Sequence, residues 1–341
     1  MATEHIAMGK SQSAFVVSLD FELHWGICDR ENALTDYRPN LERVREVIPR
    51  LLDVFEAFEI RATWATVGFL FYKSKEEMLE HLPEMRPGYV DRKLSAYEYL
   101  DLVGDDERDD PLHFAPSLIE EIKRRQGQHV GSHTHSHFYC LEKGQHKEAF
   151  EADIEKAVEI AGRRGIEVES LVFPRNQLNP DYIPILEKHG IVTYRGNPPA
   201  WMYEAMRGEE ATLAHRGFRL LDAYLPVRGL IESKTATNGK GLPAVNIPAT
   251  RFLRPYFPTL RGLEAIRLRR IKGEMREAAR DGRVYHLWWH PHNFGSEMDA
   301  NFQFLRRILE YRQELDERYG MPSLSMEDTV REEAEAPEAS V

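Results

Sequence analysis

Residues 14–26 of the chain read AFVVSLDFELHWG, an apolar run that leads directly into two carboxylates. A short apolar run rich in β-branched residues is typical of a strand buried on both faces of a parallel sheet. In folds built from parallel strands, ligands and catalytic groups collect at the carboxyl ends of the strands. Asp20 and Glu22 follow this run and are therefore candidate functional residues, with a helix cap or a loop acid as the alternative.

The composition narrows the class of protein. A chain of 341 residues that is 42% hydrophobic can form one large domain or two small ones. The net charge of -11 disfavours a nucleic-acid partner, because affinity for phosphate backbones comes largely from clustered Lys and Arg. The two cysteines, Cys28 and Cys140, form neither a disulfide framework nor a thiolate metal site. Residues 1–12 lack the apolar segment of a secretory signal, and no stretch is long enough for a membrane span, so we expect a cytoplasmic protein.

Apolar residues at helical spacing alternate along the chain with short strand-like runs. We expect strands at 14–17, 60–67, 127–132, 170–173, 191–194 and 283–289, with helices between them. Repeated alternation of this kind favours an α/β fold, here a distorted parallel (β/α)7-type barrel in a single domain. The predicted organisation is a flexible N-terminus (1–12), a catalytic domain (13–325) with a long loop insertion at 227–258, and an acidic disordered tail (326–341).

One predicted helix, at residues 259–280, is strongly basic. A basic amphipathic helix can lie on anionic lipid, which leaves peripheral membrane contact open. A solvated outer helix is the favoured interpretation.

Polar groups that are costly to bury follow four of the predicted strands. They are Asp20 with Glu22, the histidines of residues 133–137, Arg175, and His290 with His292. The i, i+4 spacing of His133 and His137 places both imidazoles on one side of a helical turn, where they can bind a divalent ion. Residue 134 is Thr, so the general base of the H-E-x-x-H metalloproteases is missing and any base must come from another strand.

These motifs resemble those of the NodB-type polysaccharide deacetylases, carbohydrate esterases that remove acetyl groups from sugars on a distorted β/α barrel. The resemblance covers residues 15–294 and implies a divalent metal, chiefly zinc, with Co, Mn, Ni or Fe as alternatives. It implies Asp20 as general base, His133 and His137 as metal ligands in the H-[ST]-x-x-H motif, Arg175 as the residue that orients the base, and His290 as general acid. The opening and closing motifs also resemble deacetylase-like proteins of O-antigen or capsule biosynthesis.

One position departs from the family pattern, because Phe21 stands where a second, metal-binding Asp is expected. Side chains alternate along a strand, so Asp20 and Glu22 should face one side and Phe21 the other. Either Glu22 replaces the missing ligand and Asp20 is the base, or Asp20 binds the metal and Glu22 is the base.

The expected substrate contacts come from the loop after residue 194 and from the two terminal motifs: Arg195, Asn197, Trp201, Trp25 and His292. The predicted function is metal-dependent removal of an N-acetyl or related acyl group from a nucleotide- or lipid-linked sugar during cytoplasmic glycan assembly. The alternatives are a glycoside hydrolase on a related barrel, which needs no metal, and a non-catalytic carbohydrate-binding protein, which the replacement at Phe21 would allow.

Overall fold

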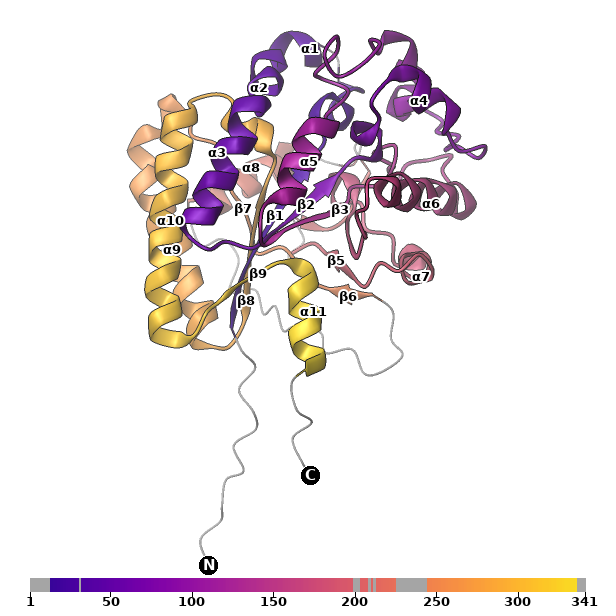
Figure 1. The fold of residues 1–341 in the computed structure, drawn as a ribbon. Helices are drawn as coiled ribbons and strands as arrows, with labels where there is room; N and C mark the ends of the chain where they lie inside the picture. The colour runs from indigo at the N-terminus through magenta and orange to yellow at the C-terminus, as the bar shows by residue number, and fades with distance from the viewer. Residues whose placement is uncertain are drawn as a thin grey trace, which may run out of the picture.

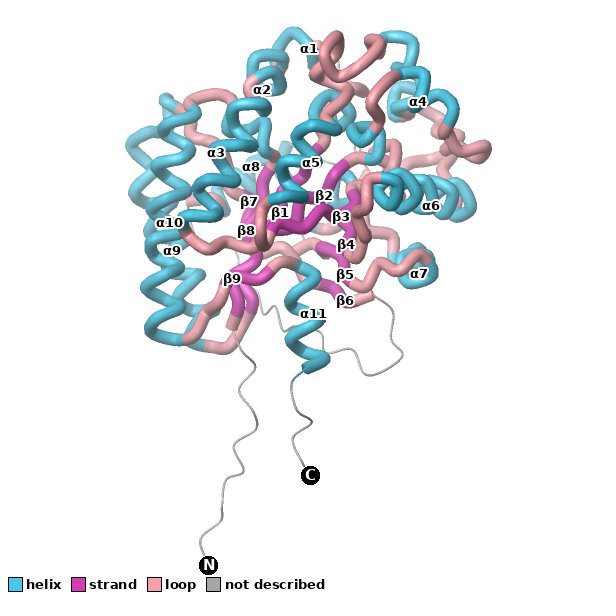
Figure 2. The backbone as a smooth tube through the Cα atoms, in the orientation of Figure 1, coloured by secondary structure: helices cyan, strands magenta, loops and turns pink. Residues whose placement is uncertain are grey.

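The computed structural model describes residues 13–30, 32–198, 203–207, 210, 213–224 and 244–335. These residues form a curled sheet in which every strand pairing is parallel (Figures 1 and 2). The strand order is β6-β5-β4-β3-β2-β1-β8-β7, and β9 pairs with the start of β1. The strands are β1 (Ala14–Phe21), β2 (Ala62–Thr66), β3 (Gln128–Ser132), β4 (Ser170–Val172), β5 (Thr193–Arg195), β6 (Val245–Asn246), β7 (Arg251–Phe252), β8 (Val284–Trp289) and β9 (Ser323–Leu324).

Helices surround this sheet, which confirms the prediction of a barrel-like α/β fold (Figure 2). The α-helices are α1 (Ala33–Asp36), α2 (Arg38–Glu42), α3 (Val44–Ala57), α4 (Lys75–Glu80), α5 (Pro116–Arg124), α6 (Lys147–Arg163), α7 (Ile183–Lys188), α8 (Leu213–Asp222), α9 (Glu264–Arg280), α10 (Met298–Tyr319) and α11 (Met326–Glu335). Short 3-10 helices follow several strands: η1 (Leu23–Gly26), η2 (Gly68–Phe71), η5 (Pro174–Asn176) and η10 (Pro291–Phe294). Others connect the helices: η3 (Arg92–Leu94), η4 (Ala96–Leu102), η6 (Pro180–Tyr182) and η9 (Pro258–Leu263).

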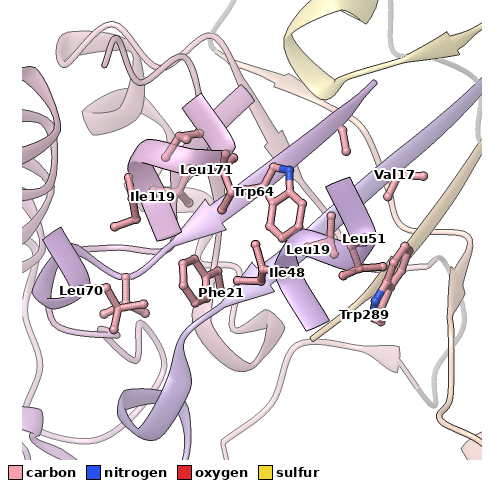
Figure 3. Packing of buried hydrophobic residues seen from close by; sticks show 14 of the residues in the cluster. Val17, Leu19, Phe21, Ile48, Leu51, Trp64, Leu70, Ile119, Leu171 and Trp289 are labelled. Carbon is pink, nitrogen blue, oxygen red and sulfur yellow. The ribbon is translucent and has the colours of Figure 1, made fainter. Parts of the chain in front are cut away.

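The strand β1 lies at the centre of the sheet, and all eight of its residues are buried. Phe21 belongs to the main hydrophobic core together with Ile48 and Leu51 of α3 (Figure 3). Burial of each large apolar side chain of this kind contributes roughly 1.5–3 kcal/mol. Because side chains alternate, this placement of Phe21 turns Asp20 and Glu22 towards the opposite face.

The prediction of a disordered tail from residue 326 is wrong for residues 326–335, which form α11 (Figure 1). The helix begins with a reciprocal cap, in which Ser325 and Asp328 each accept a hydrogen bond from the other's backbone N–H. Glu327 is buried and accepts hydrogen bonds from the hydroxyls of Thr63 and Ser170. Acidic composition suggested solvation, but these buried partners order the segment against the sheet.

The predicted flexible N-terminus (1–12) lies outside the described residues. So do residues 225–243, which include most of the predicted loop insertion, and residues 336–341 of the predicted tail. The described end of that loop contains the two short strands β6 and β7. The basic helix α9 packs Leu268, Ile271 and Met275 into the core, as expected of an outer helix of the domain. Among the described residues, no helix has the length and apolarity needed to cross a bilayer.

Candidate active site

Three buried side chains from the ends of β1 and β3, which β2 separates in the sheet, converge at the carboxyl ends of the strands. Glu22 follows β1, and His133 and His137 follow β3. The Oε2 atom of Glu22 lies 3.3 Å from Nε2 of His133 and 3.1 Å from Nε2 of His137. One ligand atom from each residue lies within 4.8 Å of the other two. This carboxylate and imidazole set matches the ligands that zinc and similar ions take in catalytic sites.

The hydrogen bonds of His133 test whether this cluster fits a cation. Its Nδ1 lies 2.8 Å from the carbonyl oxygen of Val172, which fixes Nδ1 as the donor and leaves Nε2 of the neutral ring as an acceptor. That acceptor faces the carboxylate of Glu22, which is itself an acceptor. Two acceptors at this distance require a second ring proton or a metal ion between them. The donor set therefore fits a divalent cation.

The second histidine of the cluster, His137, is oriented like His133, with Nδ1 against a protein oxygen and Nε2 facing Glu22. Its Nδ1 lies 3.2 Å from the hydroxyl of Tyr139, and its Nε2 points towards Glu22. Burial lowers the pKa of His137 to about 4, with the hydrogen bond to the carboxylate of Glu22 opposing the shift. The ring is therefore neutral near pH 7, the form that can ligate a metal.

A buried carboxylate, Asp153 of α6, holds the loop that carries the two histidines. It accepts hydrogen bonds from the backbone N–H groups of His135 and Ser136, at 2.6 and 3.1 Å, and from the Ser136 hydroxyl. Thr134 and His137 have φ values of 63° and 57°, in the left-handed region that non-glycine residues rarely adopt. We infer that the Asp153 contacts help to offset this strain. His135 points away from the cluster, as expected, and its Nε2 lies 2.9 Å from the hydroxyl of Tyr72.

Asp20 is held by an arginine from across the sheet. Arg195 of β5 donates to both of its carboxylate oxygens, at 2.7 and 2.8 Å, and also donates to the hydroxyl of Ser18. The guanidinium carbon of Arg195 lies 4.0 Å from the ring centre of Trp288. Burial opposes ionisation of Asp20, but the charge of Arg195 and its hydrogen bonds outweigh burial, so the pKa of Asp20 lies below its ordinary value.

The expected pairing of Arg175 with Asp20 is therefore wrong. Arg175 instead donates to both carboxylate oxygens of Asp29, and its guanidinium lies 4.3 Å from the ring centre of Tyr139. The physical reason is the backbone of η5, where Arg175 has a φ of 54° and the strand has already ended. Arg195, still within β5, occupies the position from which a guanidinium reaches Asp20.

His290 follows β8 and faces both carboxylates. Its Nε2 lies 3.5 Å from Oε1 of Glu22 and 3.8 Å from Oδ2 of Asp20. The side chain is partly exposed, and its Nδ1 lies 3.3 Å from the side-chain nitrogen of Asn293. A positioned, partly exposed imidazole beside two carboxylates is suited to proton transfer.

Glu22 and Asp20 thus have different surroundings. Burial opposes ionisation of Glu22, but the charge of His290 and the hydrogen bonds of His133 and His137 hold its pKa well below the ordinary value. Asp20 is bound through both oxygens to Arg195, whose charge lowers the pKa of Asp20 more than the charges of His133 and His290 do. Of the two assignments that the sequence leaves open, this geometry favours Glu22 as ligand and Asp20 as base.

These residues open into a cavity of about 960 Å³, within the range of roughly 300–1,000 Å³ typical of small-molecule sites. Of the expected substrate contacts, Asn197 lines this cavity, whereas Arg195 is buried against Asp20. Trp25 is fully buried, donates its indole N–H to the carbonyl of His113, and does not line the cavity. His292 is buried and stacks on His290. Trp201 lies outside the described residues.

Two contributors to the site were not predicted from the sequence. Ser18 lies two residues before Asp20 on β1, and His286 of β8 lies four residues before His290, so each is on the same face as its candidate. The hydroxyl of Ser18 lies 2.8 Å from Nε2 of His286, whose Nδ1 lies 3.0 Å from the carbonyl oxygen of Ile247. Period-two spacing from the known candidates is the signal that could have identified both.

Comparison with known proteins gives one family and a set of similar folds. Residues 33–194 match the family model described as polysaccharide deacetylase, a range that includes His133 and His137 but not Asp20, Glu22 or His290. No curated protein matches the chain significantly in sequence.

Two solved structures show the same fold over nearly the whole chain. One is from Mycobacterium smegmatis, with 15% identity, a TM-score of 0.59, and 98% of this chain and 95% of the other covered. Another is from Pseudomonas aeruginosa PAO1, with 13% identity, a TM-score of 0.55, and 97% and 94% of the two chains covered. Both are described as polysaccharide deacetylases.

Proposed function

We propose that this chain belongs to the polysaccharide deacetylase family, whose model matches residues 33–194, and that it is a metal-dependent hydrolase of the acetyl amide of an acetylated sugar. The observation that carries the proposal is the convergence of Glu22, His133 and His137 beside the Arg195-bound carboxylate of Asp20. The family match extends over neither carboxylate, so their roles rest on the geometry.

Glu22, His133 and His137 would hold the metal ion. A divalent cation there would act as a Lewis acid that polarises the acetyl carbonyl and acidifies water. The buried Nδ1 contacts of both histidines keep Nε2 directed at Glu22, which preorganises the ligands before any ion binds.

Asp20 is the proposed general base. Its carboxylate is kept ionised by the bidentate contact with Arg195, so it can accept the proton of the attacking water. The contacts of Arg195 with Ser18 and Trp288 fix the guanidinium, which in turn fixes the direction in which Asp20 accepts.

His290 is the proposed general acid. Amide hydrolysis needs a proton on the leaving sugar nitrogen, and a positioned imidazole can donate one. His290 lines the cavity, and its Nε2 lies within 3.8 Å of carboxylate oxygens of both Asp20 and Glu22. The base and the acid therefore share one small volume around the reacting amide.

The test is acetate release from N-acetylated sugars by metal-loaded protein. We expect Asp20→Asn and His290→Ala each to remove most of the activity, by about 10²- to 10⁴-fold, as is usual for a general base or acid. Acetate release that survives both metal chelation and His133→Ala would contradict the proposed metal dependence, and metal-independent cleavage of a glycosidic bond without acetate release would favour a glycoside hydrolase. Glycan binding without acetate release from any sugar would favour a non-catalytic role.

The narrower assignments remain predictions from the sequence. They are zinc as the metal, a nucleotide- or lipid-linked intermediate as substrate, a cytoplasmic location, and a role in O-antigen or capsule biosynthesis. The shared element of these assignments is an acetylated carbohydrate substrate, which the family match supports.

A further inference from the structure

A cationic side chain lines the same cavity as the metal-type cluster but is not used by the proposed chemistry. Arg254 follows β7 and contributes to the cavity wall together with Phe252, His290 and Trp288. The ring of Phe252 lies 4.7 Å from that of Trp288 and 5.8 Å from that of His290. Arg254 is thus only two residues along the chain from a side chain that contacts the proposed general acid.

The two arginines whose charges act on Arg254 both have carboxylate partners. Arg251 pairs with Asp222 and Glu274, and Arg267 pairs with Glu264. The backbone carbonyl of Arg254 accepts a hydrogen bond from Arg267, which anchors the segment.

The Arg254 guanidinium itself has no carboxylate or hydrogen-bond acceptor against it within the described part of the chain. Its side chain is only partly exposed. Burial, ahead of the nearby charges of Arg267 and Arg251, lowers the pKa of Arg254 from its ordinary value, and Tyr203 and Tyr224 oppose this shift. A partly buried, unpaired charge is unfavourable unless something neutralises it. Arg30 also lines the cavity but is exposed and needs no partner other than water.

We propose that Arg254 binds an anionic substituent, a phosphate or a carboxylate, on the acetylated sugar whose amide lies at Asp20 and His290. This inference rests on the proposed function and specifies its substrate class. Guanidinium groups bind phosphate and carboxylate through two parallel hydrogen bonds, which gives both affinity and orientation. The cavity is large enough to hold a sugar together with such a substituent.

The test compares three sugars with the full-length, metal-loaded protein. They are N-acetylglucosamine, N-acetylglucosamine 1-phosphate and N-acetylmuramate, which are neutral, phosphorylated and carboxylated. Binding is measured by calorimetry and repeated with EDTA, so that phosphate contact with the metal is separated from contact with Arg254. The variants are Arg254→Gln, Arg254→Lys and, as the matched control, Arg269→Gln, which alters an exposed arginine of α9 outside the cavity.

We expect at least one anionic sugar to bind more tightly than the neutral one, and Arg254→Gln to weaken that binding about tenfold or more. Arg254→Lys should retain part of the affinity, and Arg269→Gln all of it. Unchanged affinity of Arg254→Gln for the neutral sugar shows that the site has folded. A preference for the phosphate or for the carboxylate identifies which substituent the site accepts, and either one supports the inference.

The inference would be overturned if Arg254→Gln bound each anionic sugar as tightly as the unmodified protein does. Equal binding of the neutral and anionic sugars by the unmodified protein would also overturn it. Arg254-dependent binding without acetate release from any sugar would support the anion site while contradicting the proposed deacetylation, so the two failures are distinguishable.

Discussion

Arg195 donates two parallel hydrogen bonds to the carboxylate of Asp20, at 2.7 and 2.8 Å, across a sheet in which their strands are not neighbours. Three strands, β2, β3 and β4, separate β1 from β5 in the sheet order. The contact therefore depends on the curl of the sheet. It links the orientation of the proposed base to the tertiary structure of the whole domain.

Replacement of Arg195 should change the pH dependence of the reaction. Arg195 lowers the pKa of Asp20, so Arg195→Gln should raise that pKa and move the acid limb of kcat/KM to higher pH. We also expect kcat/KM at neutral pH to fall by on the order of 10²-fold, because the base is then misdirected. The measurement is the pH profile of kcat/KM for acetate release.

The matched control is Arg175→Gln, which removes the contact with Asp29 and leaves Asp20 paired. Its acid limb should stay in place. If the acid limb of kcat/KM moved in Arg175→Gln but not in Arg195→Gln, the result would support the pairing of Arg175 with Asp20 that the sequence predicts.

Gly26 should be essential for the position of Glu22. A Cβ atom at Gly26 would lie 2.0 Å from the carboxyl carbon of Glu22, so Gly26→Ala should displace that carboxylate and lower metal affinity by about 10- to 100-fold. The control is Gly162→Ala in α6, where a Cβ would meet nothing within 4 Å. It should leave metal affinity unchanged and stabilise the helix by up to ~1 kcal/mol. Metal titration of both variants checks the prediction, and equal affinities would contradict it.

The metal-free protein should become more stable as the pH rises from about 4 to 6.5. Burial lowers the folded-state pKa of His135, His286 and His292 to about 3, so between these pH values the unfolded chain binds more protons than the folded one. Each group contributes a slope of about 1.4 kcal/mol per pH unit in that range. Asp153 opposes the trend, because burial raises its pKa to about 6 and the folded chain then holds its proton up to a higher pH.

Urea unfolding at several pH values between about 4 and 6.5 measures this slope. His135→Gln removes one titrating group and should flatten the rise, whereas a slope unaltered by the substitution would argue against buried neutral histidine as its cause.

The contacts of Glu327 should stabilise the end of the barrel opposite the active site. Glu327→Ala leaves the buried hydroxyls of Thr63 and Ser170 without their acceptor, which should cost about 1–3 kcal/mol of unfolding free energy. Metal content should not change. The control Glu317→Ala, at an exposed position of α10, should stay within about 0.5 kcal/mol of the unmodified protein. A loss no larger than that of the control would show that α11 is not anchored by Glu327.

Local pattern was enough to predict the central strand, the metal-type histidines and the shared direction of Asp20 and Glu22. The shared direction of Asp20 and Glu22 follows from the alternation around Phe21. His133 and His137 do come together, but the helical turn expected from their i, i+4 spacing is wrong, because residues 133–137 form no helix and both Thr134 and His137 have positive φ values. The partner of Asp20 depends instead on which residues the curled sheet brings together, so Arg175 was chosen where Arg195 makes the contact.

The C-terminal segment shows a second limit of the sequence. Its acidic composition indicated solvation, but one carboxylate, Glu327, is buried and bonded to two strands. Composition averages over residues and cannot show that one member of an acidic run has buried partners. The reciprocal cap between Ser325 and Asp328 was the local signal for a helix beginning there.

The most direct test of the account is the metal content of Asp20→Asn and Glu22→Gln, measured by elemental analysis after dialysis against Zn²⁺, beside their rates of acetate release. If Glu22 is the ligand and Asp20 the base, Glu22→Gln loses most of its metal, as His133→Ala and His137→Ala do. Asp20→Asn then keeps its full complement of metal and loses its activity. Loss of metal from Asp20→Asn, with metal retained in Glu22→Gln, would contradict this division of roles.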